Sequence, residues 1–550
     1  MRYTYCIFFL FLFILSTNAQ NLKIKVGQET AWDRKMNFFQ RIIQADQDGC
    51  VFFHKYFDGS GPGSTFSYSL QKFDNQGNLL KTKVFDDKKL SSFDAIQWIV
   101  IDDKIYLFER ALKFKEKALI VNMSVLSLTD FSIQINAKQL FSTEWSNPKY
   151  PPNIGLSIDT LPNKMGFGII VDKTEKTDLK IDAYRISTNG QEISKTSFVY
   201  GNNEKSVSFE NAFFNQDELH IITKVYKTFE AAKKRNNFDY LANYTIGVYD
   251  YSAKKIKDIE VSIKDKFITA GKLYQFSNTE YIFTAFYTNK VETDTNDGLC
   301  ITMVNTTTSS VTNTSFRETT NRVFNKTEKE KLLDIGSDYN MIFKALIPNP
   351  KTGGFLLLTE EVLSASSKRL ETNNASVDIS KSSNASAGEA FKHQGIVIAE
   401  ISRSGSISWI TRVSKNQYEI HRVFGDAVQN KANPGAQLAS RDLPYHTSFS
   451  FLPSTTALYL IFNDHPDNAS ITTYTPDEKE IYKFDDAQPV AVEVNYLNGK
   501  LKKRAIDIGN SKEVMSPKTF CNYLNTQYVV SWKARLFQKP TITVTVISTK

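Results

Sequence analysis

The chain has 550 residues, of which 41% are hydrophobic and 13% aromatic, with 24 Gly, 15 Pro and a formal net charge of +8 at pH 7. This composition excludes collagen-like chains, Gly/Pro-rich disordered chains and small disulfide-rich proteins. It also excludes a helical membrane protein with several spans, because no apolar run after the N-terminus approaches the roughly 20 residues that a span requires.

The first segment has the features of an export signal. Arg2 precedes an apolar run from Cys6 to Leu15, and small residues ending at Ala19 follow it. This order is typical of a cleaved signal peptide, so we expect residues 1–19 to be removed and no transmembrane segment to remain. Cys6 opens the apolar run instead of following it, so we expect no lipid anchor. The mature chain is therefore expected in the periplasm or outside the cell.

Residues 20–550 repeat one pattern, in which an apolar run, a tight polar turn and a second apolar run follow one another. The first copy turns at residues 46–49, and seven more turn near residues 102–103, 163–164, 215–216, 278–279, 349–350, 454–455 and 525–526. Asn or Asp opens most of these turns, because both side chains bond to their own backbone and tolerate left-handed conformations. The flanking β-branched and aromatic residues predict strands.

A second, more polar hairpin follows the first in most copies, with turns near residues 74–77, 129–130, 188–190, 250–252, 305–307, 403–405 and 497–499. Two hairpins make a four-stranded antiparallel module, and repeated modules predict an all-β fold, a β-propeller. Eight inner hairpins predict eight blades, and seven blades with a separate hairpin is the alternative. We expect the N-terminal strand at residues 22–26 to join the last blade and close the ring, which removes free sheet edges.

Long insertions interrupt this single predicted domain near residues 227–240, 317–338, 364–392 and 416–445. The alternation of the hairpins places all four on one face of the ring. Long loops on a rigid scaffold are where binding sites usually lie, although tolerated surface insertions are an equally good interpretation.

One candidate binding site is a basic and aromatic cluster in the first of these insertions. It consists of Lys233, Lys234, Arg235, Phe238 and Tyr240. Such a cluster could bind an anionic glycan or phosphate surface, and the alternative is a solvated loop.

A second candidate lies near the end of a predicted strand on the same face. Asp464 and His465 follow that strand, and His446 precedes the first strand of the same blade. Convergence of these groups would suit acid–base chemistry, but ordinary polar loop ends are the favoured interpretation, since no metal-ligand spacing is present. Glu360 and Glu361 end another strand; paired with Asp464 they are candidate catalytic carboxylates, and otherwise solvated charges.

The sequence contains no cofactor motif, so we predict no cofactor, no metal and no assigned catalytic residue. Three cysteines remain after signal cleavage, namely Cys50, Cys300 and Cys521. An odd number cannot pair fully within one chain, and buried thiols are expected, although one pair could still form a bridge in an oxidising compartment.

The export signal, the Lys/Asn/Phe-rich composition and the blade pattern together resemble the uncharacterised secreted β-propeller proteins of the Bacteroidota. That resemblance covers nearly the whole mature chain and implies export without a particular activity. We therefore expect a non-enzymatic binding or scaffold protein that presents its loop-rich face to a protein or glycan of the cell envelope. The alternative is an envelope carbohydrate-active enzyme, a hydrolase or lyase, with its site at the propeller funnel. Nucleic acid is not an expected partner of an exported chain, and the oligomeric state is not predicted.

Overall fold

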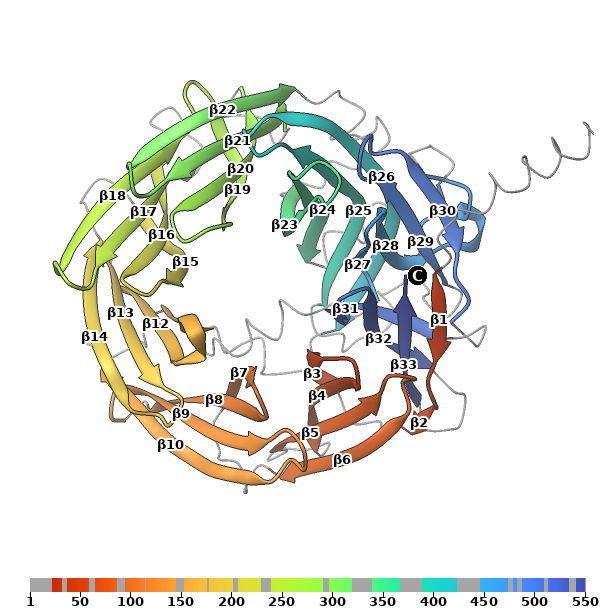
Figure 1. The fold of residues 1–550 in the computed structure, drawn as a ribbon, viewed down its shortest axis with the longest axis horizontal. Helices are drawn as coiled ribbons and strands as arrows, with labels where there is room; N and C mark the ends of the chain where they lie inside the picture. Colours follow the sequence, from red (N-terminus) through yellow and green to blue (C-terminus); the bar gives the residue numbers. More distant parts are fainter. Residues whose placement is uncertain are drawn as a thin grey trace, which may run out of the picture.

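The computed structural model describes residues 22–31, 37–58, 65–86, 94–113, 115–144, 153–175, 178–200, 206–228, 239–289, 296–318, 339–366, 388–422, 446–472, 478–481, 487–508, 513–533 and 541–549. The regular structure in these residues is β-sheet, apart from the 3-10 turns Pro162–Lys164 and Pro466–Asn468. Their strands form four-stranded antiparallel modules that follow one another around a ring, as Figure 1 shows.

The first half of the ring contains β3 (Asn37–Ala45), β4 (Gly49–Asp58), β5 (Thr65–Asp74), β6 (Leu79–Asp86), β7 (Asp94–Ile101), β8 (Lys104–Lys113), β9 (Ala118–Ser127), β10 (Ile133–Glu144), β11 (Asn153–Thr160), β12 (Gly166–Glu175), β13 (Asp178–Ser187), β14 (Glu192–Tyr200), β15 (Ser206–Phe214), β16 (Glu218–Thr228), β17 (Asp239–Asp250) and β18 (Lys255–Ser262). Each successive group of four strands, from β3–β6 to β15–β18, is one module.

The second half contains β19 (Phe267–Gln275), β20 (Glu280–Thr288), β21 (Gly298–Asn305), β22 (Ser310–Glu318), β23 (Tyr339–Pro348), β24 (Phe355–Ser366), β25 (Gly388–Ile401), β26 (Ile407–Arg422), β27 (Ser450–Pro453), β28 (Ala457–Asp464), β29 (Gln488–Asn495), β30 (Leu501–Ala505), β31 (Glu513–Tyr523), β32 (Thr526–Lys533) and β33 (Thr541–Ser548). A single pair, Leu241 with Ile268, joins the β15–β18 and β19–β22 modules into one sheet. In each module the first strand lies nearest the ring axis (Figure 1).

The N-terminal strand completes the last module, as the sequence predicted. β1 (Lys23–Val26) pairs antiparallel with β33, from Lys23 opposite Ser548 to Val26 opposite Thr545. β2 (Thr30–Ala31) pairs with the beginning of the same strand. The two ends of the chain therefore share one sheet, and the hydrogen-bonding edge of β33 is covered.

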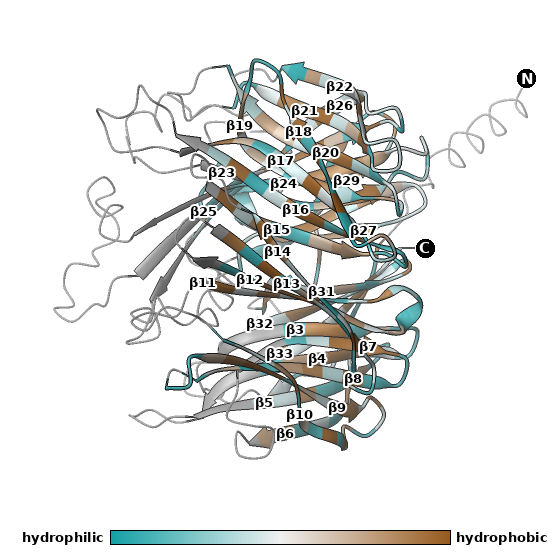
Figure 2. Cartoon of the chain, turned by 90° about the vertical axis from the view of Figure 1, so that its left-hand side faces the viewer, coloured by the Kyte–Doolittle hydropathy of each residue, from teal (hydrophilic) through white to brown (hydrophobic). Residues whose placement is uncertain are grey.

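The core lies between neighbouring modules and not within one central layer. On β20, Tyr281 and Phe283 pack toward the β15–β18 module, whereas Ile282 and Phe286 pack toward the β23–β26 module. Because alternate side chains point to opposite faces of a strand and both faces are covered, the inner strands are continuously apolar. Figure 2 shows the hydrophobic residues concentrated in the strands.

The predicted turns are confirmed, and short polar side chains form them. In the first inner turn, Asp46 Oδ1 accepts hydrogen bonds from the backbone N–H groups of Asp48 at 2.8 Å and Gly49 at 3.0 Å. In the following outer turn, Asp74 accepts from the backbone of Asn78 at 2.8 Å. Such local bonding lets Asp and Asn form tight turns, so the chain can turn often although it contains few glycines.

Irregular registers interrupt most of the innermost strands. The pairing of β15 with β16 skips Glu210, that of β19 with β20 skips Thr269, and that of β23 with β24 skips Lys344. β3 and β7 show the same shift at apolar residues, and β31 skips several residues. A bulge inserts an unpaired residue and changes the direction of its side chain, so Glu210 and Lys344 are free of the ordinary in-and-out alternation.

Cys50 and Cys300 are buried and Cys521 is partly buried, and these three cysteines carry free thiols. Burial raises the pKa of each thiol. No helix in the described part of the chain has the length and apolar character needed to cross a membrane.

Candidate functional site on the innermost strands

The structure separates the residues that the sequence singled out. Lys233, Lys234, Arg235 and Phe238 lie outside the described residues, and Tyr240 is described only as part of β17.

The second predicted group is partly assembled. Asp464 ends β28 fully buried, where it forms an ion pair with Lys503 and accepts a hydrogen bond from Asn468 Nδ2 at 2.8 Å. His465 begins a 3-10 turn, and its Nδ1 accepts from the backbone of Asp467 at 3.2 Å. His446 Nδ1 lies 3.3 Å from a backbone carbonyl of β31. Across the described ranges, no group of three or more His, Cys, Asp or Glu side chains is placed to hold a metal ion.

A buried carboxylate in the β23–β26 module gathers a larger set of polar groups. Glu360 on β24 is fully buried, and Lys415 of β26 and His393 of β25 contact its Oε1, the histidine Nδ1 at 2.9 Å. Its Oε2 accepts a hydrogen bond from Ser448 Oγ at 2.6 Å and lies 2.9 Å from Lys344 Nζ on β23. The interpretation of Glu360 as a solvated strand-end charge is therefore wrong, because it continues the buried face of an apolar strand.

Ser448 takes part in this network with a backbone conformation that is unusual for its residue type. Its φ is 74°, in the left-handed region that only glycine adopts without strain. Its backbone N–H donates to Gln417 Oε1 at 2.8 Å, and Gln417 Nε2 donates to the carbonyl of Asn463 at 2.7 Å. Backbone strain is retained where surrounding bonds hold it, often at functional sites.

The network continues into two more modules through Asn463. The side chain of Asn463 donates to the carbonyls of His446 and Met515, at 2.8 Å each, and accepts from the backbone N–H of Met515 at 3.2 Å. A continuous hydrogen-bonded path thus runs from β24 to β31 across three modules. The predicted His446 belongs to this path through its backbone.

The charges around Glu360 set the protonation states of the groups in this cluster. Burial acts to raise the pKa of Glu360, but Lys344, Lys415 and His393 together hold it well below its usual value, so the carboxyl is ionised. Burial lowers the pKa of His393 to about 4, so this imidazole is neutral at pH 7. One carboxylate therefore faces two lysines, and burial lowers the pKa of the inner one, Lys415, whereas the charge of Glu360 opposes that shift.

His393 also has an unsatisfied nitrogen. An ionised carboxylate only accepts hydrogen bonds, so the neutral ring must place its proton on Nδ1 and leave Nε2 as an acceptor. Nε2 is buried and has no hydrogen-bond partner. A ligand or water that donates a hydrogen bond would satisfy it.

Lys344 connects the buried cluster to the ring axis. It is the bulged residue of the innermost strand β23, and its side chain is 22% exposed whereas that of Glu360 is 0% exposed. Lys344 is therefore the partly exposed charged group of this otherwise buried cluster.

A second lysine, Lys272, lies on the first strand of the neighbouring module. Lys272 lies on β19 between Ala270 and Tyr274, which pack with Phe343 of β23. Burial lowers the pKa of Lys272; Glu210 opposes this effect, and the positive charges of Lys224 and Lys344 add to it.

Glu210 already forms an ion pair with another lysine, because its Oε2 lies 2.5 Å from Lys224 Nζ. Among the residues that the structure describes, no carboxylate lies within ion-pair distance of Lys272. We call Lys224, Lys272 and Lys344, which come from three successive modules, the inner lysine wall.

Sequence reasoning missed this wall because its members are far apart in the chain. Lys272 and Lys344 are each the one lysine of an apolar first strand, whereas Lys224 shares β16 with Lys227, and no spacing rule connects the three. A charged residue that interrupts an apolar first strand is the signal that could have identified Lys344 and Lys272.

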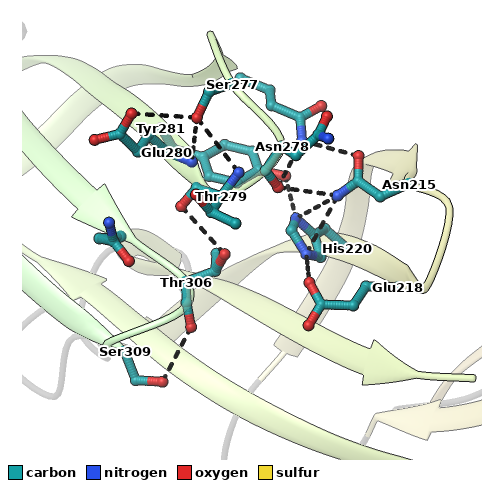
Figure 3. A network of polar contacts seen from close by, with 12 residues as sticks. Asn215, Glu218, His220, Ser277, Asn278, Thr279, Glu280, Tyr281, Thr306 and Ser309 are labelled. Atoms are coloured by element: carbon teal, nitrogen blue, oxygen red, sulfur yellow. Dashed lines mark hydrogen bonds and ion pairs between the residues drawn. The ribbon is translucent and has the colours of Figure 1, made fainter. Parts of the chain in front are cut away.

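A separate polar network joins two modules at the end of the ring where the tight turns lie. Buried His220 contacts Glu218 Oε2 through Nε2 at 2.9 Å and the hydroxyl of Tyr281 through Nδ1 at 2.5 Å (Figure 3). Asn215 Nδ2 donates to the carbonyl of Asn278 in the next module at 3.0 Å. Burial lowers the pKa of His220, although Glu218 opposes this, so the network holds a neutral imidazole between the modules.

No protein-family model matches the sequence, and no curated protein matches it. Among solved structures, a chimera of apocarotenoid oxygenase (ACO) and RPE65 is similar at 9% identity and a TM-score of 0.33, covering 96% of this chain and 93% of that chain. Cobalt-substituted ACO from Synechocystis is similar at 9% identity and a TM-score of 0.32, with the same coverage. A variant of the chimera gives a TM-score of 0.35 over 88% of this chain and 94% of that chain.

The printed names of these structures are those of enzymes, against the expectation of a non-enzymatic binding or scaffold protein. The expectation rested on the lack of catalytic spacing in the sequence. In a ring of modules, however, polar side chains converge from distant strands, so local spacing does not reveal them. The low identity and TM-scores transfer no activity to this chain.

Proposed function

We propose that the protein is an enzyme that binds an anionic substrate, bearing a carboxylate, phosphate or sulfate group, at the inner lysine wall and transfers a proton there. The observation that carries this proposal is the sharing of one buried carboxylate, Glu360, by two lysines. Lys344 shares this carboxylate with the buried Lys415 and is itself partly exposed on the innermost strand β23.

The charges of the inner lysine wall suit anion binding and proton transfer. Lys224 and Lys344 pair with Glu210 and Glu360, so Lys272, which has no carboxylate within ion-pair distance among the described residues, is the lysine that would bind an anion through charge-assisted hydrogen bonds. Burial and like charges shift Lys272 toward its neutral form, in which a lysine amine accepts a proton. Lys344 and Lys224 would then stabilise the negative charge that proton removal leaves on the substrate.

The architecture supports this placement of the site. We propose that the ring is an eight-bladed propeller whose last blade contains β1, and that the chain acts after export, as its first residues predict. The innermost strands would then surround a site at the axis that all modules can reach.

Anion binding tests the first half of the proposal. The thermal unfolding midpoint is measured with phosphate, sulfate and acetate against chloride at equal ionic strength. We expect at least one of these anions to raise the midpoint of the natural chain, and Lys272→Gln to weaken that binding by about 10- to 100-fold, as expected for a hydrogen bond to a charged group. Lys257→Gln, on the exposed face of the outer strand β18, is the control and should leave the effect unchanged.

Turnover tests the second half. The natural chain is incubated with a panel of anionic esters and oxo-acids, and product formation is followed. Lys272→Arg keeps the positive charge but removes the amine that exchanges a proton, so this variant should retain anion binding and lose turnover. An anion effect that is equal in the natural chain and in Lys272→Gln would contradict the proposed site. Absence of any turnover would contradict the enzymatic function.

A further inference from the structure

Two of the three cysteines lie where the last module of the ring meets the first, the β31–β33 module beside β3–β6 (Figure 1). We call this place the closing joint. Cys50 is the second residue of β4, and Cys521 lies near the end of β31. Both belong to the apolar cluster between these two modules, where Cys521 packs against a buried set that includes Cys50. Cys300 lies on β21, in a cluster of other modules.

The registers of the strands place the two cysteines at the same level of the closing joint. Cys521 pairs directly with Tyr528 on β32. The hydroxyl of Tyr528 donates across the joint to the backbone carbonyl of Asp46 at 3.1 Å. Asp46 follows Ala45, which pairs directly with Cys50. Because directly paired residues point to the same face of a sheet, both cysteine side chains point into the joint.

The electrostatics of the two thiols agree with this placement. Burial is the main cause that raises the pKa of Cys50, and the charge of an ionised Cys521 raises it further, more than the charges of Asp46 and Asp74 do. Both carboxylates belong to the hairpin ends next to Cys50, where Asp46 accepts from the backbone N–H of Gly49. Coulomb interactions weaken with distance, so this order agrees with a position of the Cys521 sulfur beside Cys50.

The two thiols differ in their access to a reagent. Cys50 is 3% exposed, whereas Cys521 is only partly buried. Burial raises the pKa of Cys521, but the positive charge of Arg41 on β3 opposes this shift. The thiolate is the reactive form of cysteine, and a neighbouring positive charge favours it. Cys521 is therefore the thiol that an oxidant reaches first, and Cys50 is the one that reacts with it afterwards.

We propose that Cys50 and Cys521 form a reversible disulfide bond across the closing joint, with a small-molecule disulfide as the oxidant. The Cys521 thiolate attacks one sulfur of the oxidant, which forms a mixed disulfide and releases one small thiol. Cys50 loses its proton and attacks the Cys521 sulfur, which forms the bridge and releases the second small thiol. Two protein thiols are oxidised, one small disulfide is reduced, and the two protons end on the released thiols.

The position of the bridge determines its effect on the ring. β1 and β2 already hold the two chain ends together by pairing with β33. A covalent bond between a residue near each end of the chain would close a loop that contains most of the chain, and such a bond restricts the unfolded state. The oxidised chain should therefore resist opening at the closing joint, and an oxidising compartment would favour this form.

Disulfide mapping tests the pairing. The folded chain without its predicted signal peptide is treated with oxidised glutathione, the remaining thiols are blocked, and peptides are mapped by mass spectrometry without reduction. We expect one pair of linked peptides, carrying Cys50 and Cys521, and a blocked thiol at Cys300. Cys300→Ala is the matched control and should form the same bridge, whereas Cys50→Ala and Cys521→Ser should form none.

Thermal unfolding tests the effect on the ring. Each chain is measured oxidised and after reduction with dithiothreitol, so that any loss of stability caused by a substitution itself cancels. The midpoints of the natural chain and of Cys300→Ala should be higher in the oxidised form, and those of Cys50→Ala and Cys521→Ser should be equal in both forms.

A bridge that includes Cys300, or three thiols that all stay reduced, would overturn the proposal. A glutathione adduct at Cys521 without a bridge would also overturn it, because Cys50 would then be out of reach. A bridge that leaves the midpoint unchanged would refute its effect on the closing joint. None of these results depends on anion binding or turnover, so they leave the proposed function to its own tests.

Discussion

At the scale of single residues, Ser448 combines a strained backbone conformation with a hydrogen bond to a buried charge. Its φ of 74° is unfavourable for any residue with a Cβ, and its hydroxyl donates to Glu360 at 2.6 Å. These two effects are separable by substitution. Ala removes the hydrogen bond and keeps the strain, whereas Gly removes both.

We expect Ser448→Ala to lower the free energy of unfolding by about 1.5–3 kcal/mol, the range for hydrogen bonds to charged groups. Ser448→Gly should be more stable than Ser448→Ala by about 1 kcal/mol, since glycine adopts positive φ without a steric cost. Urea unfolding of both variants measures the difference. If the glycine variant were the less stable of the two, strain at this position would be refuted.

Glu360 carries a larger share of stability. Glu360→Gln keeps the size of the side chain and leaves Lys344 and Lys415 without a counter-charge, so we expect a loss of about 3–5 kcal/mol, as for other broken buried ion pairs. The exposed Glu260 on β18 offers the control, and Glu260→Gln should change stability by less than about 0.5 kcal/mol. Equal unfolding free energies of the two variants would show that the cluster adds nothing to the fold.

At the scale of elements, β1 is the strand whose pairing joins the chain ends. A chain that begins at residue 32 lacks β1 and β2 and leaves β33 with an open edge. We expect this chain to unfold at a lower temperature and to associate more readily, because open edges pair with other strands. A synthetic peptide of residues 22–31 should restore the midpoint, whereas a peptide of the same composition in scrambled order should not. Restoration by both peptides would contradict specific pairing with β33.

Among the elements, the turns follow from the local sequence pattern, whereas the bulges do not. The turns at residues 46–49 and 74–77 follow from Asp, Asn and Gly chemistry, and the structure confirms them. The bulges at Glu210 and Lys344 were not predicted. A bulge is a mismatch between two strands, so it depends on the partner's register and leaves no mark in one strand's own sequence.

At the scale of the whole molecule, buried imidazoles make the stability of the ring depend on pH. Burial lowers the pKa of His54, His220 and His393 below the unfolded value of about 6.5. The unfolded chain therefore takes up protons at these histidines before the folded chain does, so their contribution to stability is complete above pH 6.5 and is lost as the pH falls toward the folded-state pKa values.

His393→Asn tests one part of this dependence, because the Asn amide can replace the Nδ1–H donor to Glu360 without titrating. With a folded-state pKa of about 4, His393 accounts for about 3 kcal/mol of the stability lost on acidification. Between pH 7 and pH 4 the variant should lose less stability than the natural chain by that order of magnitude. Parallel pH–stability curves, recorded by chemical denaturation, would argue against a neutral His393 in the fold.

Sequence alone determined the repeated hairpins, the all-β class and the strand that joins the two chain ends, because turn chemistry and continuous apolar runs are local properties. Tertiary structure alone decided where chemistry is possible. Glu360 and Lys272 lie in different modules, far apart in the sequence. Their shifted pKa values arise from burial and from neighbours on other strands, which only the closed arrangement of the modules brings together.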